Sequence, residues 1–166
     1  MRELIKLVAI VIGIFSAIVG GAVAINGYLH DIDKRLDDRK KRTFDLIALY
    51  YSSELVRARS EILANEREIV CNPEGDLVRG PSRVSIFTHV EFSDTVEACI
   101  ETGLCDAETA RDFFAAYANW HWPILRQHIE AIRRTEAAFE LKRPYGHGLE
   151  KLADRPAKYQ ADCGKR

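Results

Sequence analysis

The sequence predicts an all-α protein with one N-terminal transmembrane helix, a long amphipathic helix and a small helical bundle outside the membrane. Three observations support this fold class. Residues 7–25 carry no charge, apolar residues after position 43 recur in helical steps, and Pro and Gly breakers gather in one loop at residues 71–82. After the apolar start, about 140 residues remain, which suffices for one modest domain.

Residues 7–25 form the predicted membrane span. As a helix they would extend about 28 Å, close to the roughly 30 Å thickness of the hydrocarbon core of a bilayer. A cleaved secretory signal is the alternative, with Arg2 and Lys6 as its basic region and residues 22–24 as its cleavage site. The apolar run is longer than the usual core of such a signal, which favours a retained span.

Small residues recur along this span at a spacing of four, which places them on one side of a helix. The first row consists of Ala9, Gly13, Ala17 and Gly21, and the second of Ser16, Gly20 and Ala24. Close van der Waals contact over small residues is a main source of helix association in membranes. We expect one row to contact another transmembrane helix, from a copy of this chain or from a different subunit, although both rows facing lipid is the alternative.

A charged stalk follows the span. Gly27 interrupts the apolar pattern, so we expect the helix to kink or end there. Residues 30–42 are nearly all charged, and their lysines and arginines could attract anionic lipid headgroups, although four aspartates weaken that field. A solvated helix with i,i+4 ion pairs is the alternative. From residue 43 to about Val70, apolar residues follow the spacing of a long amphipathic helix.

Further helices are expected after the loop at residues 71–82. One should run from about Ser82 or Arg83 to residue 102 and stop at Gly103. The next should begin after Asp106 as its N-cap and should kink or divide at Pro123. We therefore place an anchor at 1–29, a stalk at 30–42, a helical bundle domain at 43–145 and a polar tail with one short helix at 146–166.

Charges and cysteines predict opposite sides of the membrane for the helical domain. Six Lys or Arg follow the span closely and two precede it, which by the positive-inside rule places the domain in the cytoplasm. Cys71, Cys105 and Cys163 occupy loop or tail positions, which are typical of disulfides in an oxidising compartment. Four cysteines can form two disulfides in three ways, and we first expect Cys99 to pair with Cys105 and Cys71 to pair with Cys163. We favour the cytoplasmic side of a bacterial inner membrane.

The sequence contains none of the common catalytic signatures. It has no Gly-x-Ser-x-Gly, no phosphate-binding glycine loop and no Cys-x-x-Cys, and its net charge of −1 gives no indication of nucleic acid. His121 and His128 share a helix face that Glu97 and Glu101 might approach, but the Glu-x-x-His pattern of di-iron bundles is missing. We therefore interpret His121 as a core histidine and expect no cofactor or metal and no enzymatic activity.

Aromatic residues gather between positions 113 and 122. The helical spacing of Phe113, Phe114 and Tyr117 indicates core packing rather than a ligand cage. Trp120 and Trp122 should point about 200° apart on a helix, so both cannot face the same core. One of them should be partly exposed or should contact a partner.

Two segments carry a family resemblance: TFDLIALYYSSELVRARSEI at 43–62 and FSDTVEACIETGLCDAETARDFFAAYANWHWPILRQHIEAIRR at 92–134. They resemble segments of a family of small bacterial single-span membrane proteins, known as a domain of unknown function. The shared points are Ser53-Glu54 before an Arg-rich turn, an acidic helix ending in a Gly-containing turn, and a Trp- and Pro-containing segment ending in Arg. Pro123 directly follows Trp122 here, and the cysteines lie outside the family pattern. The resemblance implies a helical, cytoplasmic domain and no assigned activity.

Together these features predict a non-catalytic, single-span accessory or structural subunit of a larger membrane protein complex. Its partners would be other transmembrane helices, or its own copies, and the lipid bilayer. The alternative is a self-associating, membrane-anchored sensor or regulator whose helical domain binds a soluble partner or ligand. A fixed complex with larger proteins would distinguish the first function from the second.

Overall fold

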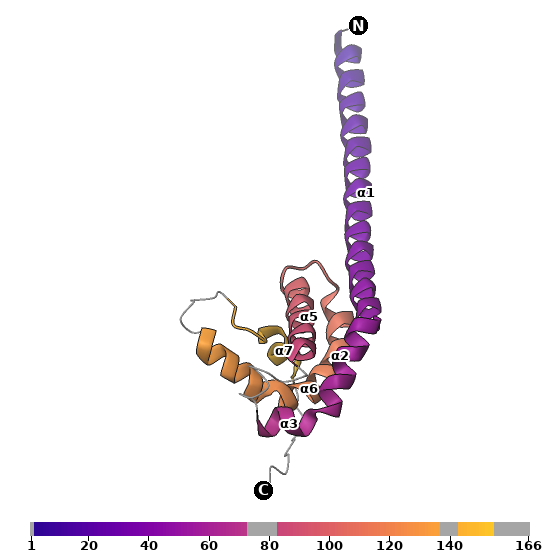
Figure 1. Ribbon diagram of the computed structural model, residues 1–166. Coiled ribbons are helices and arrows are strands. Elements are labelled where there is room, and N and C mark those ends of the chain that lie inside the picture. Colours follow the sequence, from indigo (N-terminus) through magenta and orange to yellow (C-terminus); the bar gives the residue numbers. More distant parts are fainter. Residues whose placement is uncertain (1, 73–82, 137–142, 155–166) are drawn as a thin grey trace. The chain divides into compact units, whose positions relative to one another are not determined.

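The computed structural model describes the backbone of residues 2–72, 83–136 and 143–154, and the side chains of these ranges from residue 26 onward. Within these ranges all regular elements are helices, so the all-α prediction is confirmed. They are α1 (Arg2–Tyr50), α2 (Ser53–Ala64), α3 (Glu66–Cys71), α5 (Arg83–Glu101), α6 (Ala107–Glu136) and α7 (His147–Leu152) (Figure 1). The chain divides into two compact units, Met1–Asp38 and Arg39–Arg166.

The first unit consists of the N-terminal part of α1, which passes through Gly27 without ending. The side chains of the predicted span lie outside the described residues, and so do its two rows of small residues. Among the side chains that are described, no helix is long and apolar enough to cross a membrane. The span therefore remains a prediction from the sequence.

The amphipathic helix expected to reach Val70 is broken twice. Ser52 has extended backbone (φ −60°, ψ 152°) and caps α2 by accepting a hydrogen bond from the Leu55 N–H at 3.4 Å. Asn65 separates α2 from α3, and its side chain donates to the Glu61 carbonyl at 2.8 Å. These local hydrogen bonds compete with the backbone hydrogen bonds of a continued helix. The chain changes direction at both breaks, and the buried side of each short helix stays against one core.

Helices α5 and α6 begin and end close to the expected residues. Gly103 has φ 67° at the end of α5, and the Asp106 carboxylate accepts a hydrogen bond from the Thr109 N–H at 2.9 Å at the start of α6. Of the two outcomes expected at Pro123, a kink or a division, the division is wrong, because Pro123 lies inside α6, which continues to Glu136. Packing of apolar residues after Pro123, such as Leu125 with 0% exposure, holds the helix together across the lost hydrogen bond.

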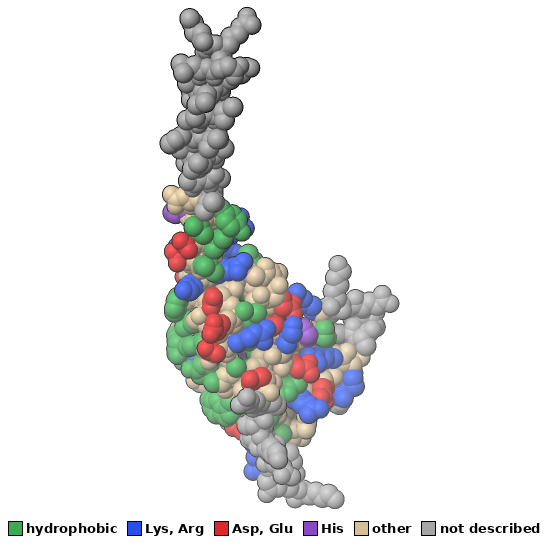
Figure 2. Space-filling view, turned by 180° about the vertical axis from the view of Figure 1, so that it is seen from behind, with side chains coloured by type: hydrophobic (Ala, Val, Ile, Leu, Met, Phe, Trp, Pro, Cys, Tyr) green, Lys and Arg blue, Asp and Glu red, His purple; other side chains and the backbone are tan. Residues whose placement is uncertain are grey.

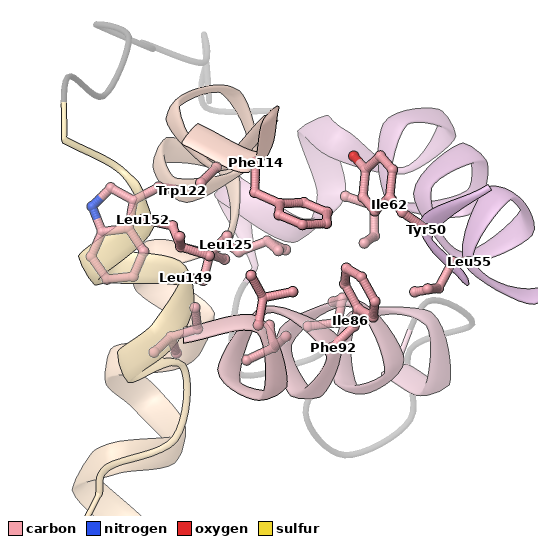
Figure 3. Packing of buried hydrophobic residues seen from close by; sticks show 14 of the residues in the cluster. Tyr50, Leu55, Ile62, Ile86, Phe92, Phe114, Trp122, Leu125, Leu149 and Leu152 are labelled. Atoms are coloured by element: carbon pink, nitrogen blue, oxygen red, sulfur yellow. The ribbon is translucent and has the colours of Figure 1, made fainter. Parts of the chain in front are cut away.

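One hydrophobic core fills the second unit. The end of α1 and helices α2, α5, α6 and α7 surround the side chains labelled in Figure 3, which are Tyr50, Leu55, Ile62, Ile86, Phe92, Phe114, Trp122, Leu125, Leu149 and Leu152. Helix α5 contacts α2, α6 and α7 and is therefore central. The bundle domain was expected to end at residue 145, whereas α7 lies beyond that boundary and contributes two buried leucines.

Candidate functional site

The α5–α6 turn is closed by a disulfide between Cys99 and Cys105, with Cα atoms 5.2 Å apart. Cys71 is also disulfide-bonded. Cys163, the partner expected for it, lies outside the described residues. The closed turn packs on α1, because the Asp106 N–H donates to the Thr43 hydroxyl at 2.9 Å, and Thr43 is fully buried.

The two tryptophans lie in different environments. Trp120 is 48% exposed, whereas Trp122 is 8% exposed and belongs to the core cluster (Figure 3). The prediction that both cannot face the core is confirmed. Trp120 is thus the candidate for contact with a partner, because exposed tryptophan is enriched at binding surfaces.

A hydrophobic surface lies where α1 ends and α2 begins, and it is called here the α1–α2 surface. It comprises four exposed residues within a short stretch of chain: Phe44, Leu49, Tyr51 and Val56. Figure 2 shows hydrophobic side chains gathered along this edge of the helical domain. The Tyr51 hydroxyl lies 3.3 Å from that of Tyr117, which joins this surface to the aromatic part of the core. Tyr51 directly follows the end of α1 at Tyr50, and its side chain is 56% exposed.

A cleft of about 170 Å³ lies between α5 and the segment that leads into α7. Asp94 lies at this cleft and accepts hydrogen bonds from the Gly146 and Gly148 N–H groups at 3.0 and 2.6 Å. Burial raises the pKa of Asp94, and these two N–H groups oppose the rise because they stabilise the carboxylate. Asp94 therefore fixes the start of α7 on α5.

Glu97 and Glu101 are two further carboxylates on α5, one and two helical turns after Asp94. Glu97 is 1% exposed, and its Oε1 lies 3.1 Å from an Arg111 nitrogen and 3.3 Å from Lys151 Nζ. Glu101 lies 2.6 Å from both Lys151 and Arg143. The hydrogen bond from Lys151 lowers the pKa of Glu101, and the charge of Arg143 adds to this effect. These ion pairs hold α6 and α7 to α5.

The structure does not bring Glu97 or Glu101 to His121 as a set of metal ligands. His121 instead packs on His89, with ring centroids 4.3 Å apart, and within the described ranges no group of three or more His, Cys, Asp or Glu side chains is arranged to hold a metal. Sequence reasoning missed His89. It lies on the same side of α5 as the buried Ile86, Val90 and Ser93, so its helical register was the signal for burial.

Comparison with protein-family models, curated proteins and solved structures finds no match to this chain. The resemblance to a family of single-span proteins therefore stays a prediction. The features that bear on the function of this chain are its own surfaces, its buried polar groups and its predicted anchor.

Proposed function

We propose that this chain is a non-catalytic, single-span accessory subunit of a larger membrane protein complex. The predicted span supplies an anchor with rows of small residues suited to contact between transmembrane helices. The helical domain supplies the α1–α2 surface and the half-exposed Trp120. Other transmembrane helices, or copies of this chain, and the surrounding lipids would be its partners.

The exposed apolar and aromatic side chains of the helical domain carry this proposal. Phe44 and Tyr51 are 58% and 56% exposed, and Trp120 is 48% exposed. Exposed aromatic side chains are enriched at protein interfaces, where tryptophan and tyrosine contribute strongly to binding energy. A docked partner would remove these side chains from water.

The disulfides support a location of the helical domain on the oxidising side of the membrane. The Cys99–Cys105 bond closes a turn, and Cys71 is bonded as well. Bonds of this kind persist outside the reducing cytosol, whereas the charge distribution favours the cytoplasmic side. We propose the periplasmic side, because disulfides require an oxidising compartment and the positive-inside rule is a statistical preference.

Thiol labelling tests this placement. Intact spheroplasts would be treated with a membrane-impermeant phosphine reductant and then with a membrane-impermeant maleimide. Labelling of the cysteines before lysis is expected on the periplasmic side, with labelling in the absence of reductant as the control for free thiols. Labelling that occurs only after lysis would place the domain in the cytoplasm.

Purification in a mild detergent tests the role as a subunit. A fixed stoichiometric complex with larger membrane proteins is expected, and Gly13→Leu with Ala17→Leu or Trp120→Ala should reduce its recovery. Leu104→Ala is a matched control, because Leu104 is also 48% exposed but lies in the disulfide-closed turn. Recovery of the chain alone, or unchanged recovery with all variants, would contradict the proposal.

The cleft beside Asp94 favours a second candidate function, a self-associating anchored sensor or regulator that binds a ligand. Asp94 and Glu97 from α5, Arg143 from the segment before α7 and His147 at the start of α7 line a volume of about 170 Å³. A lone homo-oligomer in the same purification would support this candidate over the accessory subunit.

A further inference from the structure

Two histidine rings pack against each other inside the helical domain. His89 on α5 and His121 on α6 are 2% and 1% exposed, and their ring centroids lie 4.3 Å apart with 45° between the ring planes. Neither nitrogen of His89 has a hydrogen-bond partner among the described residues, and the same holds for Nε2 of His121. Nδ1 of His121 lies 2.8 Å from the Tyr117 carbonyl oxygen. The two imidazoles therefore pack largely as neutral aromatic rings.

The groups that face this pair provide no negative charge. Helix α1 contributes Tyr50, and α2 contributes Arg59, whose guanidinium lies 3.7 Å from the centre of the Tyr50 ring and donates to the Tyr50 carbonyl at 2.5 Å. Helix α6 adds the Tyr117 phenol, and α7 adds apolar leucines to the small cavity beside His89. The described residues that line this cavity include no Asp or Glu. A proton on either ring would thus add positive charge to a region that already contains a cation.

Both rings are held in the neutral form in the folded domain. Burial lowers the pKa of His89 well below its usual value, and the charges of His121 and Arg59 act in the same direction. Burial also lowers the pKa of His121, although the Tyr117 carbonyl opposes this shift. Once the helices separate, water surrounds both rings, and each regains a pKa of about 6.5.

We propose that the His89–His121 pair is an acid-sensitive latch, in which α5 and α6 pack together only while both rings are neutral and separate when the rings take up protons. This device depends on the helical domain alone and operates whichever partner the domain binds. If the domain lies on the periplasmic side, the latch would respond to the pH outside the cell.

The direction of the pH effect follows from proton linkage. The packed state has the lower histidine pKa, so the opened state binds more protons below pH 6.5, and the stability of the packed state falls as the pH falls. Between pH 6.5 and 5.5, one histidine that stays neutral in the folded domain raises the unfolding equilibrium constant by at most about fivefold, and two raise it by at most about 30-fold. The lowered pKa of Glu101 reduces the stability of the packed state only at lower pH. The raised pKa of Asp94 favours the packed state as the pH falls, so it opposes the histidine effect. Neither carboxylate therefore mimics the effect of the histidines between pH 6.5 and 5.5.

Urea unfolding of the full chain in detergent micelles tests the latch. The fluorescence of Trp120 and Trp122 reports on α6 beside His121, and unfolding would be followed at pH 6.5 and 5.5 without reductant. The wild type should show the larger rise, of up to about 30-fold, and His89→Leu should show a rise of at most about fivefold. An equal pH response in the wild type and His89→Leu would overturn the proposal.

Nuclear magnetic resonance of the wild type provides a measurement that does not depend on a stable variant. With ¹³C-labelled histidine, two ring signals should remain in the neutral position at pH 5.8 while the domain is folded, whereas N-acetylhistidine amide in the same buffer is mostly protonated. If every histidine signal follows the reference peptide, the latch is excluded.

Discussion

Helix α5 buries polar side chains in two different ways at its contacts with α7 and with α6. Toward α7, Asp94 accepts two backbone N–H bonds, and Glu97 pairs with Lys151. Toward α6, His89 packs on His121 with neither of its nitrogens hydrogen-bonded among the described residues. A carboxylate is ionised at neutral pH and therefore needs compensation, whereas an imidazole can enter a core as a neutral ring. The α7 contact is thus fixed by charge, whereas the part of the α6 contact formed by His89 and His121 depends on pH.

The tightest point of the α5–α7 contact is Gly148, and its substitution should have the largest effect. A Cβ atom at Gly148 would lie 2.5 Å from both the Asp94 Cα and the Ser93 carbonyl oxygen, which are backbone atoms that cannot move aside cheaply. Gly148→Ala should therefore lower the free energy of unfolding by about 3 kcal/mol, measured by urea titration.

Gly103→Ala is the control for this prediction. At Gly103 the positive φ of 67° is unfavourable for alanine, but a Cβ would meet only the end of the Arg39 side chain at 4.0 Å. A loss of about 1 kcal/mol is expected there. Equal losses at the two glycines would mean that α7 does not pack closely on α5.

The carboxylate of Asp94 should rank second. Asp94→Ala removes the acceptor for the Gly146 and Gly148 N–H groups, and leaving two partly buried donors unpaired should cost about 2 kcal/mol. Glu130→Ala removes only an exposed ion pair with Arg126, so its cost should stay below about 0.5 kcal/mol. Similar urea midpoints for both variants would show that the α7 contact does not depend on this carboxylate.

The disulfide should have an effect close to that of Asp94→Ala, and it separates covalent from pH-dependent stability. Replacing Cys99 and Cys105 together by alanine frees a short loop, which should lower the free energy of unfolding by about 2 kcal/mol. Its dependence on pH between 6.5 and 5.5 should stay that of the wild type, because no histidine is changed. A flattened pH response in this variant would show that the turn, and not the ring pair, carries the acid sensitivity.

Local signals predicted several elements correctly. The start of α6 follows from Asp106, whose side chain caps the first turn, and the end of α5 follows from Gly103, which adopts a backbone conformation that other residues disfavour. The opposite exposure of Trp120 and Trp122 follows from the rotation per residue of a helix. Each of these predictions depends on residues within a few positions of one another.

Other features could not be predicted in this way. Ser52 breaks the long amphipathic helix although its neighbours favour helix, and Tyr50 before the break and Leu55 after it both belong to the same core. Pro123 stays inside α6 because packing on both sides compensates for its missing N–H. The helix break at Ser52 and the continuous helix through Pro123 could therefore be established only from the structure.

The sequence by itself determined the helical class, the caps of α5 and α6, and the apolar stretch of residues 7–25, because each depends on residues close along the chain. The tertiary structure decided that His89 meets His121 across two helices and that Asp94 holds residues more than 50 positions away. These contacts depend on how helices pack in space, and the periodicity of one helix specifies its buried side but not the residue that faces it.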